Sequence, residues 1–181
     1  MHVTYRYRVK DKHSATLNRM AKSVNYVWNY CCEVQRHATK WGRKWPSAFD
    51  LVKLCTSSAA ELGLHSDTVK TICREFSARR NAIRRCPRWR SAKKNLGWVP
   101  FVRRAVQIDG STVTYLKRNY RFWLSRAIAG KIKAGAFVQD ARGRWYVTFQ
   151  CEVVDELSMG VGEIGIDLGL KALATCSDGT T

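Results

Sequence analysis

The chain has 181 residues, with 45% hydrophobic and 11% aromatic residues and a formal net charge of +18. This apolar content excludes a disordered tail, and no apolar run reaches the 18 residues of a transmembrane helix. So much positive charge is costly self-repulsion unless an anionic partner relieves it, so we expect nucleic acid as the partner and no membrane.

The first elements along the chain are a strand and a long helix. In residues 3–9, valine and tyrosine alternate with threonine and arginine, which indicates a half-buried strand with a basic outer face. Ser14 could then cap a helix, because apolar residues follow from Leu17 to Cys31 at three- and four-residue spacings. We expect this amphipathic helix to continue to about Lys40.

Two shorter helices are expected next. The stretch 41–46 contains Gly42 and Pro46 and should break the first helix. Ser47 and Asp50 have the spacing of a capping box and should open a second helix. Ser66 should cap a third helix, which Pro87 stops at the latest.

The hydrophobic period changes from helical to alternating after Leu96. Short strand-like runs follow, with turn signals at Asp109-Gly110 and around Asn119. The clearest strand covers residues 144–154, where apolar residues on one face alternate with polar residues on the other.

These elements predict an α+β fold. A lone first strand is not stable, so it should pair with the later strands. Residues 1–13 and 96–157 would then form a small antiparallel β-barrel, and residues 14–95 a helical insert into it.

The strongest candidate for nucleic-acid contact is a basic stretch at residues 70–94, in which ten basic residues accompany one acidic residue. Its members are Lys70, Arg74, Arg79, Arg80, Arg84, Arg85, Arg88, Arg90, Lys93 and Lys94. Residues 70, 74, 80 and 84 can share one flank of a helix. Arginines bind phosphates in a bidentate manner, so this stretch predicts nucleic-acid binding, with a solvated helix face as the alternative.

Trp89 lies between two arginines in the sequence PRWR. Its indole could stack on an unpaired base, or it could pack into the core.

A second basic area lies on the later strands and consists of Arg103, Arg104, Lys117, Arg118, Arg121, Arg126, Lys131 and Lys133. Such distributed charge is suited to binding along a phosphate backbone, but phosphate contacts do not recognise the base sequence.

The seven cysteines include no CxxC pair. This spacing argues against a zinc site in the chain and against a disulfide framework. Several cysteines occupy apolar positions of the patterns, where a free thiol behaves as a small buried hydrophobe. We therefore expect a reducing compartment.

Residues 160–181 differ from the rest, because acidic residues outnumber basic ones there. Asp167 lies inside the apolar run from Ile164 to Leu168. A carboxylate in such a run is costly unless it is paired or bound to a metal, and both alternatives fit the pattern.

GIDLGLKALATCSDG resembles the first RuvC motif of the TnpB/OrfB family of transposon-encoded, RNA-guided DNA endonucleases, which are related to compact type V CRISPR effectors. Earlier elements are similar to that family in the same order: the opening strand YRYRV, Asn29 in VWNY, PRWR, and the hairpin FVQDARGRWYVTFQCEV. The resemblance covers essentially the whole chain, and its last block is the most specific.

The resemblance implies a wedge-like β-barrel (1–13 and 96–157), a helical recognition insert (14–95) and the start of an RNase H-like nuclease domain (160–181). It implies guide RNA and target DNA as partners, and a location in the prokaryotic cytosol in association with the nucleoid. Asp167 would be the first catalytic carboxylate and a ligand of Mg²⁺, which is expected only in a completed nuclease site.

The family's later glutamate and aspartate and its paired CxxC motifs have no counterpart among these residues. We therefore expect the chain to be cleavage-incompetent alone, and a second polypeptide could supply the rest of the nuclease domain. The alternatives are a stand-alone RNA- or DNA-binding regulator and a structural RNA-binding protein.

Overall fold

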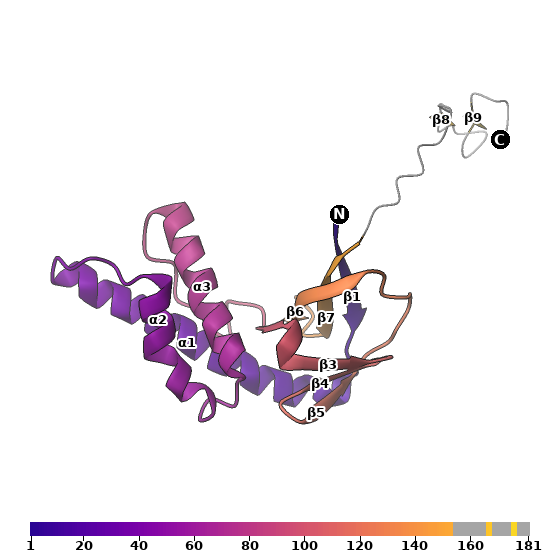
Figure 1. Ribbon diagram of the computed structural model, residues 1–181, viewed down its shortest axis with the longest axis horizontal. Helices are drawn as coiled ribbons and strands as arrows, with labels where there is room; N and C mark the ends of the chain where they lie inside the picture. The colour runs from indigo at the N-terminus through magenta and orange to yellow at the C-terminus, as the bar shows by residue number, and fades with distance from the viewer. Residues whose placement is uncertain (154–165, 168–174, 177–181) are drawn as a thin grey trace.

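The computed structural model describes residues 1–153, together with short strands at 166–167 and 175–176. It contains three α-helices on one side and antiparallel sheets on the other (Figure 1). The predicted α+β class is confirmed. Among the described residues, no helix combines the length and hydrophobicity that a bilayer crossing requires.

Helix α1 (Ser14–Lys40) extends through the helical part and reaches the sheets at its N-terminal end (Figure 1). Its predicted extent is confirmed, and Leu17, Val24 and Cys31 are fully buried on its apolar face. Ser14 is not the N-cap, because a 3-10 turn at Asp11–His13 begins the helical backbone earlier.

The two shorter helices are α2 (Ala48–Cys55) and α3 (Ser66–Ile83). The capping box of Ser47 and Asp50 is confirmed at the start of α2, which a 3-10 turn at Thr56–Ala59 follows. The prediction that Ser66 caps α3 is wrong. His65 takes that position, because its Nδ1 accepts a hydrogen bond from the Asp67 backbone N–H.

The larger sheet joins the two ends of the described chain. Its strand order is β1 (His2–Arg8), β7 (Trp145–Glu152), β6 (Lys131–Gln139) and β2 (Trp98–Val102). All neighbours are antiparallel, and His2 pairs with Glu152 at one end of the β1–β7 ladder. The prediction that the first strand pairs with later strands is confirmed, and all three helices lie between the paired strands in sequence.

The smaller sheet is a meander of β3 (Val106–Asp109), β4 (Thr112–Tyr115) and β5 (Arg118–Arg121). The turn predicted at Asp109-Gly110 is confirmed. The turn predicted around Asn119 is present but lies at Leu116 and Lys117, both with positive φ. Asn119 itself lies within β5.

The predicted barrel is not closed among the described strands. One isolated bridge between Val9 and Phe122 links the two sheets on one side. On the other side a 3-10 turn at Arg103–Ala105 interrupts the extended backbone between β2 and β3, so β2 pairs only with β6 and β3 only with β4. Aromatic rings, including those of Phe122 and Phe149, fill the space between the sheets.

Candidate nucleic-acid interface

Side chains of α1 form hydrogen bonds with the backbone of the PRWR segment and hold this segment against the helix. Asn29 accepts a hydrogen bond from the Arg90 N–H and donates one to the Arg90 carbonyl, both at 2.8 Å. The Trp28 indole N–H donates to the Arg88 carbonyl at 3.1 Å. Two motifs about sixty residues apart in the sequence, VWNY and PRWR, therefore lie side by side.

The side chain of Arg90 is engaged within the protein. Its Nε donates to Asn25 Oδ1 at 2.8 Å and its Nη2 to the Leu96 carbonyl at 3.1 Å. The guanidinium lies 5.7 Å from the Trp28 ring and 5.8 Å from the Trp98 ring. Burial lowers the pKa of Arg90. This arginine holds the loop in place through these two hydrogen bonds and its contacts with the two indole rings.

Arg80 is likewise engaged and does not share an exposed flank with Arg74 and Arg84. Only 4% of it is exposed. It donates to the Pro46 carbonyl at 2.6 Å and to Ser77 Oγ at 3.0 Å, so it ties α3 to the segment between α1 and α2. Desolvation lowers the pKa of Arg80.

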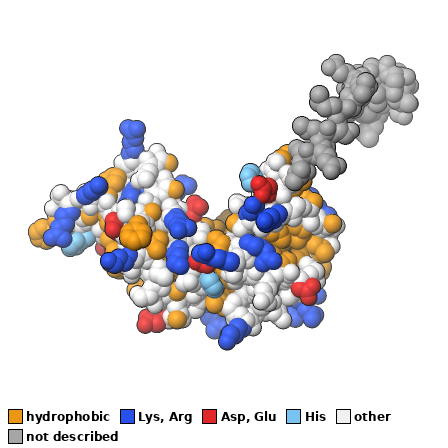
Figure 2. All heavy atoms as spheres, in the orientation of Figure 1, with side chains coloured by type: hydrophobic (Ala, Val, Ile, Leu, Met, Phe, Trp, Pro, Cys, Tyr) orange, Lys and Arg blue, Asp and Glu red, His pale blue; other side chains and the backbone are white. Residues whose placement is uncertain are grey.

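The other members of the predicted stretch remain available to a ligand, with the exception of Lys70, which forms an ion pair with Asp67. The exposed ones are Arg74, Arg79, Arg84, Arg85, Arg88, Lys93 and Lys94. Figure 2 shows Lys and Arg side chains far more abundant than acidic ones over the helical part.

Trp89 lies at the surface, with 46% of its area exposed, which excludes the alternative of a core tryptophan. The Arg36 guanidinium of α1 lies 5.2 Å from the centre of its ring. Arg36 also forms an exposed ion pair with Glu33 at 3.3 Å, a contact that water screens strongly. Trp89 thus offers an aromatic surface beside a cation.

A pocket of about 450 Å³ opens where the C-terminal ends of α1 and α3 come together. We call it the basic pocket; its lining comprises Gln35, Arg36, Thr39, Lys40, Trp45, Arg84, Arg85 and Cys86. Gln35 is 1% exposed, and among the described residues neither its Nε2 nor its Oε1 has a hydrogen-bond partner. The lining combines four cations, an indole and an unpaired carboxamide.

Helix geometry explains why cations can gather there. Helix α1 ends at Lys40 and α3 at Ile83, and the carbonyl end of a helix carries partial negative charge that favours nearby cations. The sequence patterns did not point to Arg36, Lys40 or Trp45 as parts of the interface. The i,i+4 spacing of Arg36 and Lys40 on the polar face of the first helix could have indicated these two cations.

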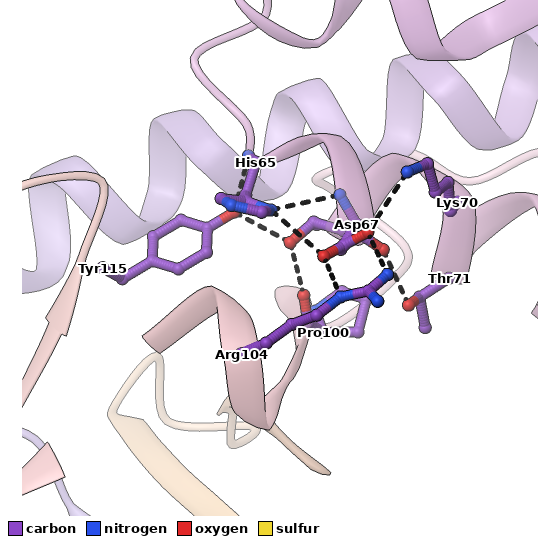
Figure 3. Close-up of polar contacts among 8 residues, drawn as sticks. His65, Asp67, Lys70, Thr71, Pro100, Arg104 and Tyr115 are labelled. Carbon is purple, nitrogen blue, oxygen red and sulfur yellow. Dashed lines mark hydrogen bonds and ion pairs between the residues drawn. The ribbon is translucent and has the colours of Figure 1, made fainter. Parts of the chain in front are cut away.

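Part of the second basic area is neutralised by an acidic residue at the opposite end of α3. Arg104 donates to both oxygens of Asp67, at 2.6 and 2.7 Å, and Lys70 lies 3.3 Å from the same carboxylate (Figure 3). The hydrogen bonds from Arg104 are the main reason that the pKa of Asp67 is lowered to about 2. Another member, Lys133, pairs with Glu152 at 2.6 Å.

Neutral hydrogen bonds complete this junction between α3 and the sheets. Thr68 Oγ1 donates to the Pro100 carbonyl of β2 at 2.8 Å and lies 2.8 Å from the Tyr115 hydroxyl of β4. The Tyr115 hydroxyl accepts from the His65 backbone N–H at 2.9 Å (Figure 3). The junction therefore fixes the helical part against both sheets. The remaining second-area residues, Arg103, Lys117, Arg118, Arg121, Arg126 and Lys131, are exposed.

Asp167 lies in the two-residue strand β8 (Ile166–Asp167), which pairs with β9 (Thr175–Cys176). The surroundings of its side chain, like Glu163 and Asp178, lie outside the described residues. Mg²⁺ binding by Asp167 therefore stays a prediction from the sequence.

Comparison with known protein families finds no matching family model, and comparison with curated proteins finds no similar sequence.

Proposed function

We propose that this protein binds structured nucleic acid as a TnpB/OrfB-type protein, in which the helical part and the sheets hold a guide RNA and the DNA beside its target. The observation that carries the proposal is the basic pocket. Its lining contains four cations and the indole of Trp45 and includes no acidic residue.

The chemistry of this surface suits an unpaired or looped strand better than a regular duplex. Guanidinium groups such as those of Arg84 and Arg85 bind phosphates through paired N–H donors. The exposed indole of Trp89 and that of Trp45 can stack on bases, which are accessible only where a strand is unpaired. A phosphate backbone crossing the pocket could thus place a base against either ring.

In such a protein, each part of the chain would have a specific role. The two sheets would act as the wedge, residues 14–95 as the recognition insert, and Asp167 as the first of several carboxylates that bind two Mg²⁺ ions. Two such ions stabilise the attacking and leaving oxygens of a phosphodiester. The support is the order of the motifs in the sequence, and the 181 residues alone are expected to bind without cleaving.

Binding is tested with labelled single-stranded RNA at several salt concentrations. The double variant Arg84→Ala/Arg85→Ala should lower the slope of log K against log salt by about 1.4, since each single-strand phosphate contact contributes about 0.7. The matched control Lys12→Ala/Arg142→Ala removes the same charge from exposed positions elsewhere and should leave most of the slope unchanged. Equal losses in the two variants would refute a localised interface.

Sequencing of the RNA that copurifies with the chain separates the proposed family function from its alternatives. A TnpB-type protein should retain one defined transcript, whereas a general RNA-binding protein should retain a broad mixture. Magnesium-dependent DNA cleavage by the purified chain, lost in Asp167→Ala, would contradict the expectation that these residues only bind.

A further inference from the structure

Three buried cysteines converge from the three helices. Cys31 of α1, Cys55 of α2 and Cys73 of α3 place their sulfur atoms within 4.8 Å of one another. Cys31 and Cys73 are fully buried and Cys55 is 3% exposed. All three are free thiols. The nucleic-acid proposal does not involve this cluster, which lies inside the helical part.

From this convergence we propose that Cys31, Cys55 and Cys73 form a binding site for one soft thiophilic cation of the Zn²⁺ and Cd²⁺ class. Thiolate sulfur is the preferred ligand of such ions. We call these residues the thiol triad.

The dimensions of the triad fit three-coordinate thiolate binding after a small contraction. A zinc–sulfur bond of about 2.3 Å places the sulfurs of a trigonal site about 4.0 Å apart. The observed upper limit of 4.8 Å is therefore less than ~1 Å too wide, a change that small side-chain rotations can supply.

Charge and access also favour an ion. Three thiolates around a divalent ion leave one net negative charge, and such a charge inside a protein needs a partner. The guanidinium of Arg80, a buried cation of α3, belongs to the same helical packing and would offset that charge.

A surface pocket of about 210 Å³ between α1 and α2 leads to Cys55. Tyr26, Val27, Tyr30, Leu54 and Ser58 complete its lining. The pocket gives the ion an entry path as far as Cys55.

The consequence for the fold is that one ion would tie the short helix α2 to both longer helices. An ion that binds only the folded state stabilises that state by mass action. At about 100 times its dissociation constant, it should raise the Tm of a chain of this size by about 5–10 °C.

The test titrates the full reduced chain with Cd²⁺ and with Zn²⁺. Native mass spectrometry should find one tightly bound ion per chain, and Cd²⁺ should produce the ultraviolet absorption of sulfur-to-metal charge transfer. The variants Cys31→Ser, Cys55→Ser and Cys73→Ser should each lose that absorption. Cys151→Ser replaces an equally buried cysteine of β7, and Cys32→Ser replaces the neighbour of Cys31, so both should keep it.

A wild-type chain that binds no ion, or a Cys151→Ser variant that loses as much absorption as Cys55→Ser, would overturn the proposal. If a triad variant does not fold, X-ray absorption spectroscopy of the wild-type Cd²⁺ complex counts the sulfur ligands directly. Three sulfur ligands are expected, and two or fewer would overturn the proposed site.

Discussion

The two ends of α3 use arginine in opposite ways. At the N-terminal end, Arg104 meets the carboxylate of Asp67, and the pair belongs to the junction between helix and sheets. At the C-terminal end, Arg84 and Arg85 line an open pocket whose lining includes no acidic residue. The side-chain chemistry is the same, and the neighbours decide whether the charge supports the fold or faces a ligand.

A count of basic residues in the sequence therefore overestimates how many cations can contact a nucleic acid. A guanidinium that is paired with a carboxylate has its charge balanced, even where the side chain is 73% exposed as in Arg104, whereas one without such a partner keeps its affinity for phosphate. The exposed cations at the C-terminal end of α3 are unfavourable for the isolated protein and become favourable when a polyanion binds. Three substitutions test whether these arginines serve the fold or a ligand.

The largest effect is expected for Arg90→Ala, because this residue lies among the ligand-facing cations but serves the fold. The change removes the hydrogen bonds to Asn25 and the Leu96 carbonyl and the contacts with two indole rings. The free energy of unfolding, measured with urea, should fall by about 2–4 kcal/mol. The neighbouring exposed variant Arg88→Ala should change it by less than about 0.5 kcal/mol. Similar losses in both variants would remove the distinction between them.

A smaller effect is expected for Asp67→Asn at the opposite end of α3. Loss of the carboxylate weakens the hydrogen bonds from Arg104 and Lys70, so the free energy of unfolding at neutral pH should fall by about 1–3 kcal/mol. The exposed Glu75→Gln variant of the same helix is the matched control and should be nearly neutral.

The pH dependence of that loss has a definite sign. The pKa of Asp67 is about 2 in the folded protein, below the value of about 3.9 for an unfolded chain. Its stabilisation is therefore present above pH ~4 and is lost as the pH falls toward 2. Wild-type and Asp67→Asn unfolding curves should converge over that range. A constant difference between them down to pH 2 would contradict the role of the ionised carboxylate.

The smallest effect, and the most selective, is expected for Arg84→Gly. Arg84 ends α3 in the left-handed conformation at φ 51°, where a side chain is strained and glycine is not. The free energy of unfolding should rise by about 0.5–1 kcal/mol, while RNA binding weakens because one cation is lost. Thermal melts and binding titrations of the same preparation measure both. Weaker binding together with lower stability would mean that Arg84 supports the fold.

Local sequence patterns predicted much of the fold. The apolar spacing from Leu17 to Cys31 located α1, and the Ser47–Asp50 box located the start of α2. The cap of α3 could not be predicted in the same way, because an imidazole replaces the usual hydroxyl there. The open side between β2 and β3 depends on a turn at Arg103–Ala105 that has no glycine or proline to mark it.

The candidate site was predicted less completely, because helical period alone does not show what covers each face. Arg80 and Arg84 fall on one flank of an ideal helix, yet the segment containing Pro46 covers Arg80. The thiol triad was not predicted, and its proposed ion runs against the expectation, drawn from the missing CxxC pairs, that the chain has no zinc site. Its members lie far apart in the sequence, and only the packing of three helices brings them together.

The pairing of β1 with β7 also affects how the protein folds during synthesis. His2 leaves the ribosome early, but its partner Glu152 is made 150 residues later. Contacts of such wide sequence separation form slowly, and until they form β1 is an unpaired edge able to join other chains. The helices can pack in the meantime, so slower translation after residue 83 should increase the yield of native chains relative to aggregates.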